Sequence, residues 1–280
     1  MSKIQTSIQR AIDKSRGAQP KKRKKRSAGA TKDKPVKNEL GSGVFRLFQA
    51  AETDHEAMEQ NRLVTDVDDR AAIGAYKVLR TRVLQRMRSN NWRSIVVTSA
   101  GAGEGKSLTA LNLALSLSRD VNQSVLLVDL DLQRSRIAQY FGFLGGIQKG
   151  ISEYLRGSAE IADIVYSPSD IPRISVIPNV ETLEDSSDLL SSPRMRDLLE
   201  WIQLQSDRSI IIFDMPPVLV GDDVLAFSTE VDAILLVVTQ GKTDRVSLEK
   251  AAGLLAETNL LGVVLNKCTE TSKDNVYGYY

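Results

Sequence analysis

The pattern of apolar positions changes at about residue 68. Residues 1–65 show no apolar periodicity, whereas the chain beyond them begins with apolar residues at spacings of three and four. These positions define one face of an amphipathic helix: Ala72, Tyr76, Leu79, Val83 and Met87. Asp68 or Asp69 precedes the first of them and is a suitable N-cap, so we predict that the helix begins there.

Short apolar runs and helical patterns then alternate along the chain. The runs predict strands at 94–99, 124–129, 173–178, 209–214, 233–238 and 261–266. Helical patterns lie at 107–119, 135–142, 150–156, 158–165, 193–206, 222–229 and 244–257. Because the strands are continuous apolar runs, both of their faces should be buried, which is typical of a mostly parallel sheet covered by helices. The predicted fold class is therefore α/β, with one domain over residues 66–268.

Charge separates the same two parts of the chain. The whole sequence has 37 Lys and Arg residues against 35 Asp and Glu, but residues 1–40 contain 13 basic and 3 acidic residues. The basic run 21–26 repels itself, so residues 1–65 are interpreted as a mostly disordered tail in which 43–50 is a docking element or a brief helix. The tail either solubilises the protein or contacts anionic lipid or nucleic acid. Lipid is the preferred partner, and nucleic acid is not expected.

Several classes of protein are excluded by what the sequence lacks. No apolar run approaches the ~18 residues of a membrane span, and the N-terminus has no apolar segment of the secretory type, so we expect a cytoplasmic protein. The single Cys268 excludes an internal disulfide and a multi-cysteine metal site. The single His55 lies in an acidic, polar stretch, which argues against a Ser-His-Asp hydrolase.

A glycine-rich segment, 100–107, connects the first predicted strand to the helix that follows it. Its sequence AGAGEGKS fits the phosphate-loop pattern G-x-x-x-x-G-K-[ST], except that Ala100 takes the first position. The backbone N–H groups of such a loop and the helix N-terminus bind phosphates. Lys106 is predicted to contact the β- and γ-phosphates and Ser107 to ligate Mg²⁺. The predicted nucleotide-binding residues are Gly101, Ala102, Gly103, Glu104, Gly105, Lys106, Ser107, Leu108 and Asn266.

Two further predicted strands end in carboxylates. Asp129 and Asp131 stand at the end of one strand, and Asp214 stands at the end of another. Because ligands bind outside the carboxyl ends of parallel strands, these side chains should lie beside the phosphate loop. Three carboxylates next to a triphosphate require a cation, and Ser107, Asp129 and Asp214 are the predicted Mg²⁺ ligands. The alternative is that each Asp caps the helix that follows its strand.

The end of the last predicted strand bears on the choice of nucleotide. A guanine-binding Asn-Lys-x-Asp motif that began at Asn266 would need Asp at position 269, where the chain has Thr269. ATP is therefore favoured over GTP.

In combination, these motifs resemble those of the bacterial tyrosine kinases (BY-kinases) of capsule and exopolysaccharide biosynthesis. The resemblance covers residues 68–280, and it rests on the phosphate loop, DLD at 129–131, DMPP at 214–217 and the tyrosine-rich C-terminus. It implies a P-loop NTPase fold and a tyrosine kinase that depends on ATP and Mg²⁺. By this resemblance the catalytic residues are Lys106, Asp129, Asp131 and Asp214, and the first two carboxylates help to deprotonate tyrosine.

Three of the seven tyrosines lie in the last four residues of the chain. Polar residues precede them, so 269–280 is predicted to be a mobile tail, although aromatic side chains packed onto the body are an alternative. The family resemblance makes Tyr277, Tyr279 and Tyr280 the phosphoacceptors of an autokinase. In-line attack requires a controlled approach, which a neighbouring subunit provides more readily than the same chain, so transfer in trans is expected.

The alternative function is a regulatory ATPase of the ParA and MinD type, which switches partners without phosphorylating protein. Those ATPases have an extra Lys five residues before the invariant one, where this chain has Gly101. The kinase family usually has Pro at the position of Ala102, and it has Glu-x-x-Arg-x-x-Arg for ring assembly where this chain has Gly74, Lys77 and Arg80. Gly101 and the tyrosine tail favour the kinase, and the altered motif leaves the oligomer size open.

The resemblance also implies partners. Single-domain members of the family depend on a membrane-anchored polysaccharide co-polymerase as activator, and this chain is expected to do so as a homo-oligomer that regulates capsule or exopolysaccharide biosynthesis or export. Residues 21–26 would contact the anionic membrane surface. The expected location is therefore cytoplasmic and peripheral, at the inner face of the plasma membrane.

Overall fold

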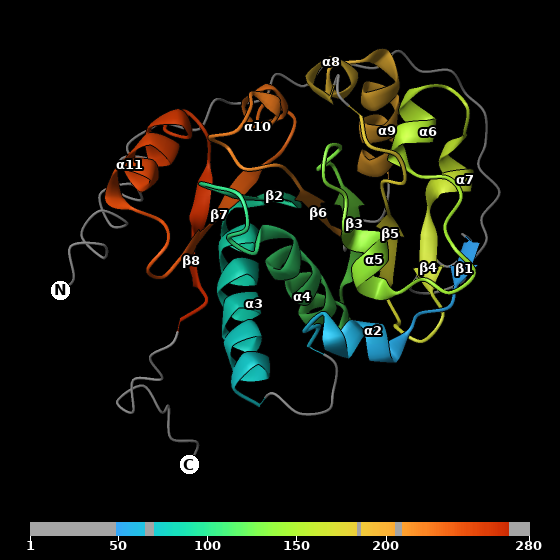
Figure 1. Cartoon of the computed structure of the whole chain (residues 1–280), viewed down its shortest axis with the longest axis horizontal. Coiled ribbons are helices and arrows are strands. Elements are labelled where there is room, and N and C mark those ends of the chain that lie inside the picture. Colours follow the sequence, from blue (N-terminus) through green and yellow to red (C-terminus); the bar gives the residue numbers. More distant parts are fainter. Residues whose placement is uncertain (1–48, 65–69, 184–185, 205–208, 269–280) are drawn as a thin grey trace.

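One sheet runs across the protein, and helices cover both of its faces (Figure 1). The computed structural model describes residues 49–64, 70–183, 186–204 and 209–268. Its strands are β1 (Gln49–Ala51), β2 (Ser94–Ser99), β3 (Ser124–Asp129), β4 (Tyr166–Pro168), β5 (Ile174–Ile177), β6 (Ser209–Asp214), β7 (Ala233–Thr239) and β8 (Leu260–Asn266). They lie in the order β1-β4-β5-β3-β6-β2-β7-β8, and only β4 and β5 pair antiparallel. The predicted mostly parallel sheet is thus confirmed.

The helices follow the predicted alternation, with ends that differ by a few residues. They are α2 (His55–Gln60), α3 (Arg70–Asn90), α4 (Lys106–Ser118), α5 (Ile137–Phe141), α6 (Ile151–Leu155), α7 (Ile161–Ile164), α8 (Ser186–Leu190), α9 (Pro193–Gln203), α10 (Asp223–Phe227) and α11 (Arg245–Leu254). In the described part of the chain, every helix is too short or too polar to cross a membrane.

Two apolar clusters lie on opposite faces of the sheet. Along β2, Val96 belongs to one cluster, whereas Ile95 and Val97 belong to the other. The first cluster includes apolar side chains of α6, α9, α10 and α11, and the second includes those of α2, α3, α4 and α5. Both faces of the central strands are therefore buried, which explains their continuous apolar sequences.

α4, the helix that follows the phosphate loop, is enclosed by the sheet and by α3. All of its 13 residues except Leu108 are buried. On its outer side, the Arg80 guanidinium donates to the Ser116 carbonyl at 2.9 Å, and the Ser116 hydroxyl donates to the Tyr76 carbonyl at 3.3 Å. A helix fixed on all sides holds its first residues, Lys106 and Ser107, in place at the edge of the sheet.

The assignment of 49–64 to the tail is wrong, because these residues belong to the folded body. β1 pairs with β4 at one edge of the sheet, and the side chains of Met58 and Leu63 are only 1% and 4% exposed. Elements of three and six residues are too short to show a period in the sequence. For the same reason β4 and α8 were not foreseen. Residues 43–48 and the cap candidates Asp68 and Asp69 lie outside the described residues.

Gly74 in the middle of α3 weakens that helix and can be replaced. A Cβ added at this position would have no atom within 4 Å. Gly74→Ala should therefore raise the free energy of unfolding by about 0.5–1 kcal/mol, because Gly loses more backbone entropy in a helix than Ala does. Ala75→Gly, at the exposed next position of the same helix, should lower it by a similar amount. Urea unfolding measures both, and a Gly74→Ala variant no more stable than the wild type would contradict this account.

Candidate active site

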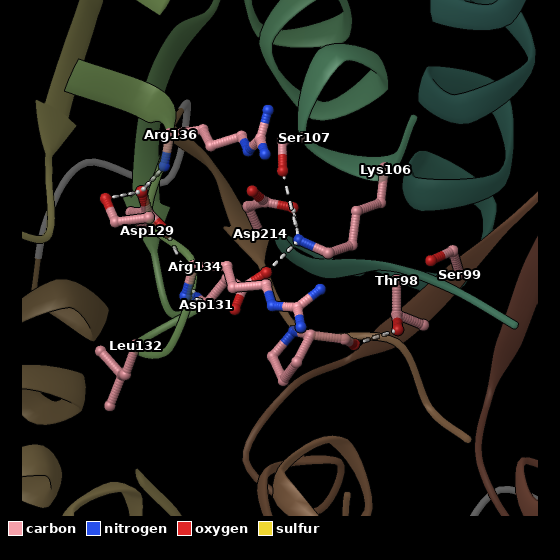
Figure 2. Close-up of polar contacts among 12 residues, drawn as sticks. Thr98, Ser99, Lys106, Ser107, Asp129, Asp131, Leu132, Arg134, Arg136 and Asp214 are labelled. Carbon is pink, nitrogen blue, oxygen red and sulfur yellow. Dashed lines mark hydrogen bonds and ion pairs between the residues drawn. The ribbon is translucent and has the colours of Figure 1, made fainter. Parts of the chain in front are cut away.

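The register of neighbouring strands brings the predicted site residues to one edge of the sheet. β6 lies between β3 and β2, and Asp214 at its end is in register with Asp129 at the end of β3. The phosphate loop begins directly after β2. Lys106 and Ser107 consequently lie beside Asp214, and Lys106 also reaches Asp131, whereas the Asp129 side chain is turned toward the backbone of Arg136 (Figure 2).

Two glycines give the phosphate loop its shape. Gly103 and Gly105 have φ angles of 72° and 91°, in the left-handed region that favours glycine. A Cβ at Gly105 would lie 2.2 Å from the side-chain amide nitrogen of Asn266, so a larger residue does not fit there without a shift. The same amide nitrogen donates to the Glu104 carbonyl at 2.9 Å. Asn266, predicted to bind nucleotide, thus supports the loop itself.

Glu104 holds the loop with both its side chain and its backbone. Its carboxylate accepts hydrogen bonds from the Gly101 N–H at 3.0 Å and from the Thr243 hydroxyl. Its carbonyl accepts one from the Thr239 hydroxyl at 3.1 Å. The residue is only 3% exposed, and such a buried carboxylate requires these donors. The network fixes the loop while its partners supply no positive charge.

Two lysines that follow β7 and β8 bind two further carbonyls of the loop. Lys242 Nζ donates to the Ala102 carbonyl at 2.6 Å, and Lys267 Nζ donates to the Gly103 carbonyl at 2.9 Å. The sequence interpretation missed Lys242 and Lys267, together with Thr239 and Thr243. They lie at least 135 residues from their partners, and no local motif marks them.

Lys106 is buried between two carboxylates. Its Nζ lies 2.6 Å from Asp131 Oδ2 and 3.4 Å from Asp214 Oδ1, and it donates to the Ser107 hydroxyl at 3.2 Å. Burial alone would lower the pKa of Lys106, but Asp214 and Asp131 outweigh it and raise the pKa above 10.5. The ammonium group is therefore charged at neutral pH and is placed where a phosphate could replace one of its partners.

The Asp129 carboxylate is turned toward the loop that follows its strand. Oδ1 accepts a hydrogen bond from the Asp131 N–H at 3.2 Å. Oδ2 accepts from the Ser135 hydroxyl at 2.8 Å and from the N–H groups of Arg136 and Ile137 at 3.3 and 3.2 Å. The last of these residues begins α5, whose N-cap is Arg136, so Asp129 supports the start of this helix without being its N-cap, which differs from the alternative interpretation. Its predicted role as a Mg²⁺ ligand stays a prediction.

Burial makes ionisation of both strand-end carboxylates unfavourable. It raises the pKa of Asp129 from 3.8 to about 7, and the nearby Asp214 carboxylate adds to this, although Ser135 and Lys106 oppose it. Burial likewise raises the pKa of Asp214, against the opposing charge of Lys106. A cation bound at this edge would favour the ionised forms of both.

The donors that remain at the site fit Mg²⁺. Asp214 Oδ2 is buried and accepts no hydrogen bond from the described residues. Together with the Ser107 hydroxyl it offers hard oxygen ligands of the kind that Mg²⁺ takes. Nowhere in the described residues are three or more His, Cys, Asp or Glu side chains arranged to hold a metal alone. Phosphate oxygens of a bound nucleotide would therefore have to complete the ligand set.

The remaining predicted site residues are placed as follows. Ala102 and Gly103 are exposed at the outer turn of the loop, and Leu108 is half-buried near the start of α4. Tyr277, Tyr279 and Tyr280 lie outside the described residues.

Comparisons with known proteins agree with this geometry. Residues 95–277 match the family described as "CobQ/CobB/MinD/ParA nucleotide binding domain". The chain is 31% identical to the tyrosine-protein kinase CpsD of Streptococcus agalactiae over 207 residues, which cover 73% of this chain and 86% of that protein. It is 30% identical to the tyrosine-protein kinase YwqD of Bacillus subtilis over 207 residues, 73% and 84% of the two chains. The kinase domain of the Escherichia coli tyrosine kinase ETK superposes with a TM-score of 0.63 at 27% identity, over 74% of this chain and 80% of that one.

The raised pKa of Asp129 predicts a pH-dependent stability in the absence of Mg²⁺. Between 3.8 and about 7 the folded protein keeps a proton on this carboxyl that the unfolded chain has lost, so stability should fall as the pH rises through this window. Asp129→Asn removes the titrating group. Relative to that variant, the wild type should therefore be less stable at about pH 8 than at about pH 5. Urea unfolding at both pH values measures this, and a pH-independent difference between the two proteins would show the idea to be wrong.

The hydrogen bonds of the buried Glu104 predict that two substitutions at this position affect nucleotide affinity differently. Glu104→Ala should weaken the binding of Mg²⁺–ADP by about tenfold or more, because the Gly101 N–H loses its acceptor and the loop its fixed shape. Glu104→Gln keeps an acceptor oxygen, and the Thr243 hydroxyl can accept from its amide, so binding should stay within about threefold of the wild type. Calorimetric titration measures the affinities, with Glu200→Ala on the exposed side of α9 as the control. Equal losses in the Gln and Ala variants would argue against a geometric role.

Proposed function

The chain belongs to the CobQ/CobB/MinD/ParA nucleotide-binding family and, within it, to the bacterial tyrosine kinases, and from this premise we propose that it is a protein tyrosine autokinase that uses ATP and Mg²⁺. Its phosphoacceptors are Tyr277, Tyr279 and Tyr280 of a neighbouring chain. The proposal is carried by one observation, the buried Lys106 that lies between Asp131 and Asp214 at the end of the phosphate loop. Its role in the cell is to regulate the biosynthesis or export of a capsule or exopolysaccharide.

The reaction transfers a phosphoryl group from ATP to a tyrosine. The phenolic oxygen attacks the γ-phosphorus and forms a new P–O bond, while the bond from that phosphorus to the β–γ bridging oxygen breaks and its electron pair leaves with ADP. Free tyrosine has a pKa of ~10, so its proton is lost late in the transfer. Asp131 accepts this proton, because this residue is 4% exposed whereas Asp129 is fully buried.

The other residues of the site bind and position the reacting groups. The N–H groups of the loop and of the first turn of α4 hold the phosphates, and Lys106 stabilises the charge on the β- and γ-oxygens. Ser107 and Asp214 would hold Mg²⁺, which when bound neutralises charge on the triphosphate.

The proposed partners follow the family resemblance. They are further copies of the chain and a membrane-anchored polysaccharide co-polymerase that activates it, with residues 21–26 in contact with anionic lipid at the cytoplasmic face of the plasma membrane. The helix that the family uses for ring assembly is altered here. Gly74 and Lys77 depart from the motif, and the Arg80 guanidinium donates to Ser116 of its own chain. An ion pair between subunits on this helix would therefore lack the acidic residue of the motif.

Incubation with labelled ATP and Mg²⁺ tests the kinase proposal. The wild type should incorporate label, and Lys106→Met should lower incorporation by about 100-fold or more, since it removes the charge at the phosphates. The Tyr277/279/280→Phe form should lose its label and still hydrolyse ATP. Lys250→Met, on the exposed side of α11, is the matched control and should behave like the wild type.

A mixture of the two inactive forms tests transfer in trans. Lys106→Met chains offer acceptor tyrosines without a working site, and the triple Phe form offers a working site without acceptors. Label should appear on the Lys106→Met chains, identified by mass spectrometry. Steady ATP hydrolysis by an unlabelled wild type would instead favour the regulatory ATPase.

A further inference from the structure

Two arginines, Arg134 and Arg136, lie in the loop between β3 and α5 beside the site. Both Arg134 and Arg136 are exposed, and within the described residues neither guanidinium makes a hydrogen bond or an ion pair. Figure 2 shows that both side chains extend from this loop toward Lys106 and Ser107. Two free guanidinium groups therefore face the place where the phosphates of a nucleotide would lie.

We propose that Arg134 and Arg136 form a binding site for a phosphate dianion, the phosphoryl group that is transferred. The inference rests on the proposed kinase function. The same group is borne by ATP as its γ-phosphate before transfer and by tyrosine after it, so the chemistry of the ligand is the same from either source.

The backbone that carries the two arginines is held by the acidic residues of the site. The Arg134 N–H donates to Asp131 Oδ1 at 3.1 Å, and the Arg136 N–H donates to Asp129 Oδ2 at 3.3 Å. The Ser135 hydroxyl between them is bound by Asp129 and by the Asn179 carbonyl, each at 2.8 Å. The two side chains thus leave a fixed turn, which reduces the entropy lost when they bind a ligand.

The charges of the side chains around Lys106 favour such groups. Formally, Asp129, Asp131 and Asp214 carry three negative charges, and Lys106 carries one positive charge. A nucleoside triphosphate with Mg²⁺ adds further negative charge, and transfer spreads charge over the oxygens of the moving group. The two guanidinium groups bring the formal charge of these six side chains to zero. Their planar donors also match two phosphate oxygens at once, which a lysine cannot do.

Binding measurements on the full chain separate the possible outcomes. The ligands, each in the presence of Mg²⁺, are ADP, the non-hydrolysable ATP analogue AMP-PNP, and a synthetic peptide with the sequence of residues 275–280 phosphorylated on Tyr277. The test variant is Arg134→Gln with Arg136→Gln, and Arg196→Gln on the exposed side of α9 is the control. A second variant, Arg134→Lys with Arg136→Lys, keeps the charge without the planar fork.

If the dianion is the γ-phosphate, the double Gln variant should lose about tenfold or more in affinity for AMP-PNP and keep its affinity for ADP. If the dianion is phosphotyrosine, the double Gln variant should lose affinity for the phosphorylated peptide and bind both nucleotides as the wild type does. In either case the affinity of the double Lys variant for the affected ligand should lie between the affinities of the wild type and the double Gln variant. The proposed site would be wrong if the double Gln variant bound all three ligands with the affinity of the wild type. It would also be wrong if the variant lost affinity for ADP and AMP-PNP to the same extent. A wild type that binds no nucleotide at all would instead count against the proposed kinase function.

Discussion

The parallel pairing of β6 between β2 and β3 is the constraint on which the rest of the site depends. The register aligns Asp129 with Asp214, and the phosphate loop starts from the next strand. The carboxyl ends of three buried, hydrogen-bonded strands cannot move independently of one another. Lys106 is fixed in the same way, because α4 is enclosed on all sides. The ion pairs of Lys106 are thus a consequence of backbone geometry, because the backbone places the charged side chains next to one another.

The phosphate loop is held from both sides of β2. On one side, Lys106 reaches the carboxylates at the ends of β3 and β6. On the other side, residues at the ends of β7 and β8 donate to loop carbonyls, and Glu104 closes the loop on itself. These donors bind carbonyl oxygens of the loop and the Glu104 carboxylate, so hydrogen bonds to acceptor groups make the loop rigid. Its N–H groups are largely left for the phosphates, apart from that of Gly101, which the Glu104 carboxylate takes.

The sequence predicted the parts of the structure that depend on local pattern. The apolar runs identified the central strands because burial on both faces leaves no alternation, and AGAGEGKS identified the loop because backbone approach to phosphate needs glycine. β1, α2 and β4 were missed since each is too short to show two full repeats of its period. The support of the loop by Lys242 and Lys267 was missed for another reason. It depends on the order in which strands pair, and a single sequence carries no signal of that order.

The two interpretations that the sequence left open for Asp129 do not exclude each other. The carboxylate supports the start of α5 as a capping group would, and its hydrogen bonds also fix the turn that carries Asp131, Arg134 and Arg136. Removing this carboxylate would displace Asp131 and both arginines together. A loss of activity after substitution of Asp129 therefore does not identify a metal ligand, because the same loss follows from the collapse of the turn. Only a measurement of Mg²⁺ affinity separate from turnover distinguishes the two roles.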